Sequence, residues 1–388
     1  MNILFIHHVP DMYGSSRCLL RMADKLARDG HCVAATLQED GPLRNELEKA
    51  GTKVFLVREI PALHRSRLAR PTAWFGMLRD VMLSRRRIKQ IFAEFKPDLV
   101  HTNSATLLPV AGSIAHAAGI PHILHVRESF LDFGLLWKIY RMVLVFYADK
   151  IIAISGFIAG TFSARQQQAK VVTIYDGLPE QDFINISPPA VESFIEKYKL
   201  KRPLIALVGR IKLKRKGQDV LVNAAAILKH KFPDATYAMV GSPFPGNEDH
   251  LDNLKSMIRE PGLEDRIVLT GHLDQPLVAL AACDISIMAS STPEPLGNVT
   301  IESMALGKPV VGTNLGGTPE LVQDRKTGLL IPPGDAEAMA NALAYLLEHP
   351  EEAARMGQLG RERYLNEFTF DQYYEKLAQL YENSMVKT

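Results

Sequence analysis

The chain has 388 residues, which is enough for two domains that each bury a hydrophobic core. Hydrophobic residues make up 47% of it and charged residues 23%, as in an ordinary globular protein. The formal net charge of +2 lacks the basic excess of a dedicated nucleic-acid binder, so we predict no nucleic-acid partner.

The first half of the chain alternates apolar strand-like runs with amphipathic helical stretches. Residues 2–7 form the first such run, and Leu19, Met22, Ala23 and Leu26 then recur at helical spacing. Later strands are predicted at residues 32–37, 53–57, 99–102, 120–126 and 150–154. Because these runs are apolar on both faces, the pattern predicts a parallel sheet covered by helices, and hence a doubly wound α/β domain.

A basic stretch interrupts this half between residues 64 and 89. It carries eight cations against one acid, Asp80, with Trp74 and Phe75 among them. Two interpretations remain open: a helix that lies on an anionic membrane surface, or an amphipathic helix on the sheet with a solvated basic face. No uncharged apolar run approaches the roughly 20 residues of a spanning helix, and the first residues lack a signal-peptide pattern. Three cysteines without metal-ligand spacing favour a reducing compartment, so we predict a cytoplasmic protein, with a peripheral position on the inner face of the membrane if the basic stretch binds lipid.

The alternation lapses at residues 179–189, which we interpret as a linker, and then resumes. Further strands are predicted at residues 204–208, 236–240, 267–269, 284–288 and 309–312. The predicted domains are residues 1–183 and 184–367, each Rossmann-like, with a C-terminal helix at about 368–388 that packs back on the first domain. Two such domains are expected to face each other across a deep cleft at the carboxyl ends of their sheets.

Five cations lie within residues 210–216, directly after the strand 204–208. Arg210 at the strand tip is placed to bind phosphate oxygens with its planar guanidinium group, and Lys216 before a helix adds a point charge. For the three cations between them a solvated face is the simpler interpretation. The sequence contains no Asp-X-Asp motif and no convincing set of metal ligands, so we predict no metal and no cofactor.

A second cluster of polar groups follows the strand 284–288. Pro293, Pro295 and Gly297 disfavour a helix before Asn298, which places Glu294 in a loop and Glu302 in the first turns of a helix. The unpaired backbone N–H groups of residues 296–299 then form an anion site at the helix start. Glu302 is suited to a ribose diol and Glu294 to sugar hydroxyls, although two solvated glutamates would give the same pattern.

The order and spacing of four motifs resemble those of glycosyltransferase family 4, a retaining family with the GT-B fold. The motifs are Gly-Arg with Lys-Gly six residues after the Arg, Glu-Pro-Leu-Gly with a second Glu eight residues after the first, Met-Ala-Leu-Gly-Lys-Pro-Val-Val, and Gly-Gly-Thr-Pro-Glu, all within residues 209–320. Weaker similarity covers nearly the whole chain, including Pro-Asp-Leu-Val-His-Thr-Asn-Ser at residues 97–104. The resemblance implies transfer of a sugar from a nucleoside diphosphate sugar to an acceptor, with retention at the anomeric carbon.

The resemblance also assigns roles to individual residues of the second domain. Arg210 and Lys216 match the pair that binds the donor diphosphate, Glu302 the glutamate on the donor ribose, and Glu294 the first glutamate of the E-x7-E motif near the transferred sugar. The remaining matches are the phosphate-side residues Leu296, Gly297 and Asn298 and, beside the nucleobase, His272 and Leu273.

In the first domain His125, at the end of a predicted strand, matches the family's active-site histidine, and Gly14 matches an early loop near the phosphates and acceptor. Arg127 and Glu128 either reach the acceptor or form a structural ion pair. The chain departs from the family pattern at Asp176-Gly177, where Asn-Gly is frequent, and at Gly14-Ser15-Ser16, where two glycines are frequent. Both departures lie on the side that meets the acceptor or the sugar.

Several functions remain open from the sequence. The acceptor is expected to be a glycan or a lipid-linked precursor of an envelope polysaccharide or glycolipid. The alternatives are a GT-B sugar-nucleotide epimerase or hydrolase, or a non-catalytic protein that binds sugar nucleotides. A nicotinamide-dependent oxidoreductase is disfavoured because the Gly-x-Gly-x-x-Gly turn is missing after the first strand.

Overall fold

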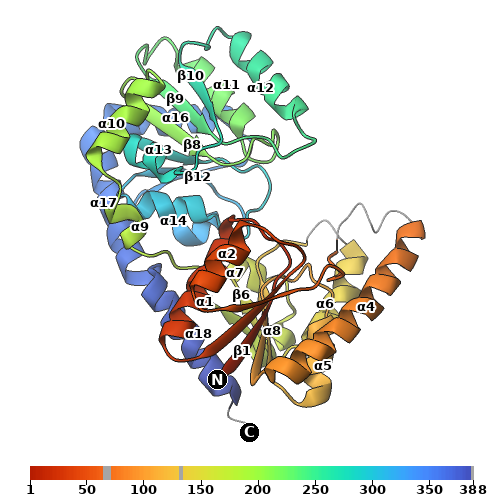
Figure 1. Cartoon of the computed structure of the whole chain (residues 1–388). Helices are drawn as coiled ribbons and strands as arrows, with labels where there is room; N and C mark the ends of the chain where they lie inside the picture. The colour runs from red at the N-terminus through yellow and green to blue at the C-terminus, as the bar shows by residue number, and fades with distance from the viewer. Residues whose placement is uncertain (64–70, 131–133, 386–388) are drawn as a thin grey trace. The chain divides into compact units, whose positions relative to one another are not determined.

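The computed structural model describes residues 1–63, 71–130 and 134–385 (Figure 1). Three cations of the basic stretch, Arg65, Arg67 and Arg70, therefore lie outside the described residues. The chain divides into two compact units. The first comprises Met1–Tyr175 together with the C-terminal segment from Tyr374, and the second comprises Asp176–Tyr373.

The first unit is built on a seven-stranded sheet with the order β3-β2-β1-β4-β5-β6-β7. All its strand pairs are parallel, as the apolar runs predict. The strands are β1 (Asn2–Ile6), β2 (Cys32–Leu37), β3 (Lys53–Leu56), β4 (Leu99–Thr102), β5 (His122–Val126), β6 (Lys150–Ala153) and β7 (Val171–Thr173). Strand β7 was not predicted from the sequence, because a run of three residues is too short to show a period.

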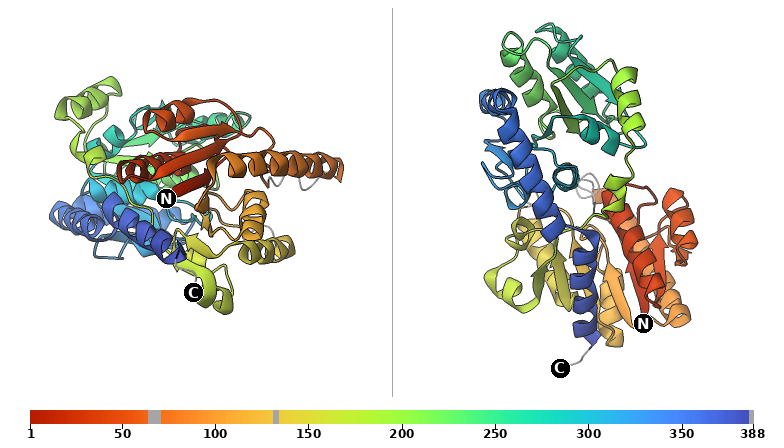
Figure 2. Two further views of the ribbon diagram at one scale, coloured as in Figure 1. Left: turned by 60° about the horizontal axis from the view of Figure 1, so that its bottom comes forward. Right: turned by 90° about the vertical axis from the view of Figure 1, so that its left-hand side faces the viewer.

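Helices cover both faces of this sheet. Figure 1 shows α1 (Gly14–Arg28) and α18 (Phe370–Met385) on one side of it, and α4 (Pro71–Phe95) and α5 (Val110–Ala118) on the other. Further helices in the described part of the unit are α2 (Pro42–Lys49), α6 (Gly134–Tyr147), α7 (Gly156–Ala159) and α8 (Ala164–Lys170). The N-terminal end of α4 projects from the rest of the unit (Figure 2, left). No helix in the described part of the chain is long and apolar enough to cross a membrane.

Helix α18 joins the first unit through two buried or partly buried tyrosines. The hydroxyl of Tyr374 donates to the carboxylate of Asp29 at 2.6 Å, and the hydroxyl of Tyr381 lies 2.5 Å from Nδ1 of His101. Tyr381 and Leu377 are fully buried. The C-terminal helix is therefore part of the core of the first unit, although it is separated from that unit's other elements by nearly 200 residues of sequence.

The second unit holds a six-stranded parallel sheet with the order β10-β9-β8-β11-β12-β13. Alternate residues of its strands face opposite layers. Ile205 and Leu207 of β8 (Leu204–Val208) pack with α11 (Gln218–Leu228) and α16 (Ala336–Glu348). Leu204 and Ala206 pack with α10 (Pro188–Lys197) and α13 (Leu277–Ala282). The strands are β8 (Leu204–Val208), β9 (Thr236–Val240), β10 (Ile267–Gly271), β11 (Ile285–Met288), β12 (Val310–Thr313) and β13 (Gly328–Ile331). The last of these was not predicted. The helices are α10 (Pro188–Lys197), α11 (Gln218–Leu228), α12 (Asp249–Arg259), α13 (Leu277–Ala282), α14 (Asn298–Ala305), α15 (Thr318–Leu321), α16 (Ala336–Glu348) and α17 (Pro350–Glu367).

The chain passes from the first unit to the second at Tyr175–Asp176. The stretch 179–189, interpreted as a linker, contains the short helix α9 (Gln181–Ile184) and the start of α10. Pro188 and Pro189 occupy the first positions of α10. Proline is tolerated there because the first N–H groups of a helix have no hydrogen-bond partner within it, so the paired prolines begin a helix.

Candidate active site

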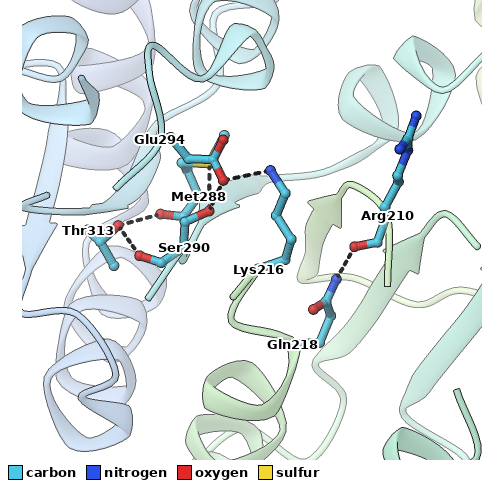
Figure 3. Close-up of polar contacts among 7 residues, drawn as sticks. All are labelled: Arg210, Lys216, Gln218, Met288, Ser290, Glu294 and Thr313. Carbon is cyan, nitrogen blue, oxygen red and sulfur yellow. Dashed lines mark hydrogen bonds and ion pairs between the residues drawn. The ribbon is translucent and has the colours of Figure 1, made fainter. Parts of the chain in front are cut away.

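Two loops of the second unit meet through an ion pair at the carboxyl edge of its sheet. Strands β8 and β11 are parallel neighbours, so the loops that follow them emerge side by side. Lys216, from the loop after β8, places its Nζ 2.7 Å from Oε1 of Glu294, from the loop after β11 (Figure 3). The Ser290 hydroxyl donates to the same Oε1 at 2.9 Å. The Glu294 side chain is 11% exposed and that of Lys216 is 28% exposed, so the pair is shielded from most of the solvent.

Close backbone packing holds these two loops together. Gly217 has a φ of 75°, and a β-carbon there would lie 2.0 Å from the carbonyl oxygen of Ala289. The Ser291 N–H donates to the carbonyl of Arg215 at 2.9 Å. The Thr313 hydroxyl donates to the Ser290 carbonyl at 3.0 Å. Glycine before α11 is therefore a steric requirement for bringing Lys216 to Glu294.

Helix α14 begins directly after the Glu294 loop. Gly297, with a φ of 93°, is its N-cap and offers no side chain, so no side-chain hydrogen bond caps the helix. The prolines and this glycine place the helix start at Asn298, as predicted from the sequence. The first backbone N–H groups of α14 have no partner within the helix and present a partial positive charge at the loop.

Arg210 does not join the Lys216–Glu294 pair. Its backbone oxygen accepts from Nε2 of the buried Gln218 at 2.9 Å, but its side chain is exposed and points away from that pair (Figure 3). The guanidinium carbon lies 5.4 Å from the centroid of the Phe244 ring. Of the four predicted groups, Lys216 and Glu294 are the two that this contact brings together.

The other predicted donor-side residues are spread along the same edge. Glu302 lies in the second turn of α14 and is half-buried, and Leu296 is fully buried. His272 follows β10, two strands away from β8, with its Nε2 3.7 Å from Asp274 and its side chain 65% exposed. Leu273 packs against the cluster around α10 and α13.

His125 lies inside the first unit as a fully buried residue of β5. Its Nδ1 is 3.3 Å from Nη2 of Arg127, and its Nε2 has no hydrogen-bond partner among the described residues. Burial, then the charge of Arg127, then His101 lower the pKa of His125 well below its usual value. The imidazole is therefore neutral. Gly14 is the first residue of α1.

The N–H of Arg127 donates to Oε2 of Glu128 at 3.2 Å, and each side chain has further partners. Arg127 donates to Oδ1 of Asn103 at 3.2 Å and to Sγ of Cys18 at 3.0 Å. Glu128 accepts from the hydroxyl of Ser104 at 2.5 Å and from the N–H of Ala105 at 3.1 Å. Burial raises the pKa of the Glu128 carboxyl.

Both halves of the chain match glycosyltransferase families. Residues 13–177 match the Glycosyl transferase 4-like domain, and residues 191–363 match Glycosyl transferases group 1. The chain is also similar to the GDP-mannose-dependent alpha-(1-6)-phosphatidylinositol monomannoside mannosyltransferase of Mycolicibacterium smegmatis, with 30% identity over 307 residues, 76% of this chain and 78% of the relative. The chain belongs to glycosyltransferase family 4. A shorter match joins it to the lipopolysaccharide core biosynthesis glycosyltransferase LpsE of Rhizobium meliloti, at 31% identity over 46% of this chain and 49% of the relative.

Solved structures establish the architecture of this family 4 glycosyltransferase. A glycosyltransferase from Rickettsia africae superposes with a TM-score of 0.84 at 23% identity, covering 100% of this chain and 99% of that one. HepE from Anabaena, solved in complex with UDP, gives a TM-score of 0.82 at 24% identity, covering 99% and 100%. The two parallel sheets with their helical layers are therefore the two domains of a GT-B fold.

The structure of the family 4 enzyme adds residues that sequence analysis had not singled out. Ser290 supports Glu294, Gln218 holds the backbone of Arg210, and Asn103 contacts Arg127. Each lies beside a motif that was recognised, but only spatial proximity identifies its partner. No group of three or more His, Cys, Asp or Glu side chains that could hold a metal ion occurs among residues 1–63, 71–130 and 134–385.

Proposed function

We propose that this glycosyltransferase moves a hexose from a nucleoside diphosphate sugar to an acceptor with retention at the anomeric carbon. The contact between Lys216 and Glu294 carries the proposal, because it puts a cation and a carboxylate beside the start of α14. A diphosphate at this edge would meet the Lys216 ammonium group and the free N–H groups of α14. A hexose attached to it would lie within reach of the Glu294 carboxylate.

In this proposal the donor lies along the carboxyl edge of the second sheet. Arg210 and Lys216 bind the diphosphate, Glu302 binds the ribose hydroxyls, and the segment of His272 and Leu273 lies beside the base. The side chain of Arg210 is exposed, and its guanidinium group is of a kind that binds phosphate in a bidentate manner. These cations and N–H groups stabilise the charge that develops on the departing diphosphate, with no metal ion assigned to that task.

His125 is proposed to act on the sugar side as a hydrogen-bonding group of the first domain, with Gly14 near the phosphates and acceptor. Its neutral ring and unpartnered Nε2 support this role, since a buried polar atom without a partner is destabilising unless a ligand satisfies it. Retention is proposed to follow from same-side displacement, in which the departing phosphate oxygen helps to deprotonate the acceptor. A double displacement would need a carboxylate nucleophile, and none is assigned.

The acceptor is proposed to be a lipid-linked glycan precursor or glycolipid. Support comes from the relatives, which are named for a phosphatidylinositol mannoside and for lipopolysaccharide core biosynthesis. The described part of the basic stretch adds a second line of support. Helix α4 exposes Phe75, which is 82% accessible, together with Leu78 and Met82, close to a run of three arginines that begins at Arg85. Helix α6 also exposes apolar side chains: Leu136, Ile139, Met142 and Phe146.

This combination fits an anionic bilayer, because apolar side chains enter the interface while cations meet lipid headgroups. The test is sedimentation with phosphatidylglycerol and with phosphatidylcholine vesicles at low and high salt. Arg86→Ser with Lys89→Ser should weaken binding to the anionic vesicles several-fold. The matched pair Lys255→Ser with Arg259→Ser, on α12, removes the same charge elsewhere and should leave binding unchanged. Equal binding by both double variants would contradict the assigned surface.

The transfer itself is tested by incubating the protein with GDP-mannose or UDP-glucose and a lipid-linked or glycan acceptor. Proton NMR of the product then gives its anomeric configuration. A retained product that also forms in the presence of EDTA supports both the retaining reaction and its independence of a metal ion. An inverted product contradicts the proposal. Release of free sugar alone would indicate a hydrolase, a changed sugar nucleotide would indicate an epimerase, and donor binding without any turnover would indicate a binding protein.

A further inference from the structure

We propose that Arg127, Asn103, His7 and Ser16 form a relay of hydrogen bonds that holds His125 in one tautomer and ties it to Asp11, in the loop before α1. The inference rests on the proposed function in one respect, namely that His125 acts on the sugar. All six residues belong to the first unit, and all except Asp11 are buried.

The arm from Arg127 to His125 determines where the imidazole proton lies. A guanidinium group donates hydrogen bonds and accepts none. Nη2 of Arg127 is 3.3 Å from Nδ1 of His125, so Nδ1 is the acceptor and the ring proton is on Nε2. The Nε2–H group is buried and has no partner among the described residues, which leaves a hydrogen-bond donor ready for a ligand oxygen.

In the arm toward Asp11, each hydrogen bond likewise has a defined donor and a defined acceptor. Nε of Arg127 donates to Oδ1 of Asn103 at 3.2 Å, which orients the amide. Nδ2 of Asn103 then donates to Nδ1 of His7 at 3.3 Å, so the proton of His7 is also on Nε2. That N–H faces the Ser16 hydroxyl at 3.2 Å, and the hydroxyl in turn donates to Oδ1 of Asp11 at 2.9 Å.

The hydrogen bonds of the relay therefore run outward from Arg127, in one arm to His125 and in the other to the Asp11 carboxylate. His7 is neutral, since burial, then His8, then Arg127 lower its pKa to about 3. Asp11 also accepts from the N–H of Tyr13 at 3.1 Å, which shapes the loop. The loop that leads into α1 at Gly14 and the ring of His125 are thus parts of one hydrogen-bonded structure, with Asn103 as the positioning residue between them.

The relay can be observed without any assay of activity. Nitrogen-15 NMR of the histidine rings in the whole protein, assigned with His7→Gln and His125→Gln, reports which ring nitrogen carries the proton. We expect His7 and His125 to be neutral with the proton on Nε2 at pH 7. A proton on Nδ1 of either ring, or a charged ring, overturns the relay.

Asn103→Asp tests the direction of the relay with almost no change of volume. A carboxylate only accepts, so it should draw the proton of His7 to Nδ1 and release Ser16 from its acceptor role. Asn45→Asp, an exposed change in α2, is the matched control and should leave both rings unchanged. A His7 proton that stays on Nε2 in Asn103→Asp contradicts the relay. If that variant fails to fold, the wild-type spectra still show whether the protons of His7 and His125 lie on Nε2, as the relay requires.

The positioning role has a separate readout in the transfer reaction. When the ring proton of His7 has moved to Nδ1, we expect kcat of Asn103→Asp to fall about tenfold or more, because small displacements of a reacting group have effects of this size. The KM for the donor should change little. An unchanged kcat with a reversed His7 proton would refute positioning of His125. Absence of transfer in the wild-type protein would refute the proposed function and leave the NMR result intact.

Discussion

Gly316 is packed against the backbone of Glu294 so closely that a β-carbon at Gly316 would lie 2.4 Å from the carbonyl oxygen of Glu294. The next residue, Gly317, donates its N–H to the same oxygen at 2.8 Å. The Gly-Gly-Thr-Pro-Glu motif therefore supports the loop that carries Glu294. The two glycines are needed for their lack of a side chain at this contact.

The first prediction follows from that contact. Gly316→Ala should displace the Glu294 loop and lower the free energy of unfolding by roughly 2–3 kcal/mol, through both the clash and the positive φ of 66°. Gly262→Ala is the matched control, because Gly262 has a φ of 68° but no atom within 4 Å of a β-carbon. Urea unfolding of both variants separates the effect of the steric clash from the effect of the positive φ. Equal losses would show that the backbone angle alone matters.

The second prediction concerns Lys216. Lys216→Met should weaken binding of UDP or GDP about 10- to 100-fold, as expected for loss of a hydrogen bond between charged groups. Lys212→Met removes an exposed cation of the same loop and should change the Kd less than threefold. Isothermal titration calorimetry gives both constants. A similar loss in the two variants would mean that general positive charge, rather than the Lys216 ammonium, holds the diphosphate.

The third prediction tests how α18 is held on the first unit. Tyr374→Phe should lower the free energy of unfolding by about 1 kcal/mol, because the phenol donates to a carboxylate at 2.6 Å at a partly exposed site. In an Asp29→Asn background the same change should have a much smaller effect. The difference between the two, measured by urea unfolding, is the coupling energy of the pair. A coupling of zero would mean that packing alone holds the helix.

The fourth prediction is a loss of stability of the first unit in mild acid. Burial is the largest cause that lowers the pKa values of His7, His101 and His125 below 6.5. The unfolded chain therefore binds more protons than the folded one, so the stability that these groups contribute is present above pH 6.5 and is lost as pH falls. Each group contributes up to about 1.4 kcal/mol per pH unit. Glu128, whose pKa is raised by burial, opposes this trend.

We expect the free energy of unfolding to fall by roughly 2–3 kcal/mol between pH 6.5 and 5.5. Both tryptophans, Trp74 and Trp137, belong to the first unit, so urea unfolding followed by their fluorescence reports on this unit. His125→Gln should reduce the fall by about 1 kcal/mol because it removes one of the three groups. A wild-type stability that is the same at both pH values would contradict the neutral, buried state of these rings.

Much of the fold follows from local patterns in the sequence. The strands β2, β4, β8 and β9 begin and end at the predicted residues, because buried parallel strands are short apolar runs bounded by turn residues. Two strands were not predicted: β7, whose three residues show no clear period, and β13. Pro293, Pro295 and Gly297 likewise determine where α14 begins, since each acts on its own backbone.

The contacts within the candidate site were decided by the tertiary structure. Lys216 and Glu294 are 78 residues apart, Asn103 and His7 are 96 apart, and Tyr381 and His101 are 280 apart. Backbone propensities and periodicity act over a few residues, so they locate the ends of β8 and β11 but not which side chain turns to which. Proton positions on His7 and His125 depend further on a single buried arginine that the sequence places only at the end of a strand. The sequence by itself determined the helices, the strands and the sheet edge where the candidate site lies. The packing of distant segments determined which side chains contact each other there.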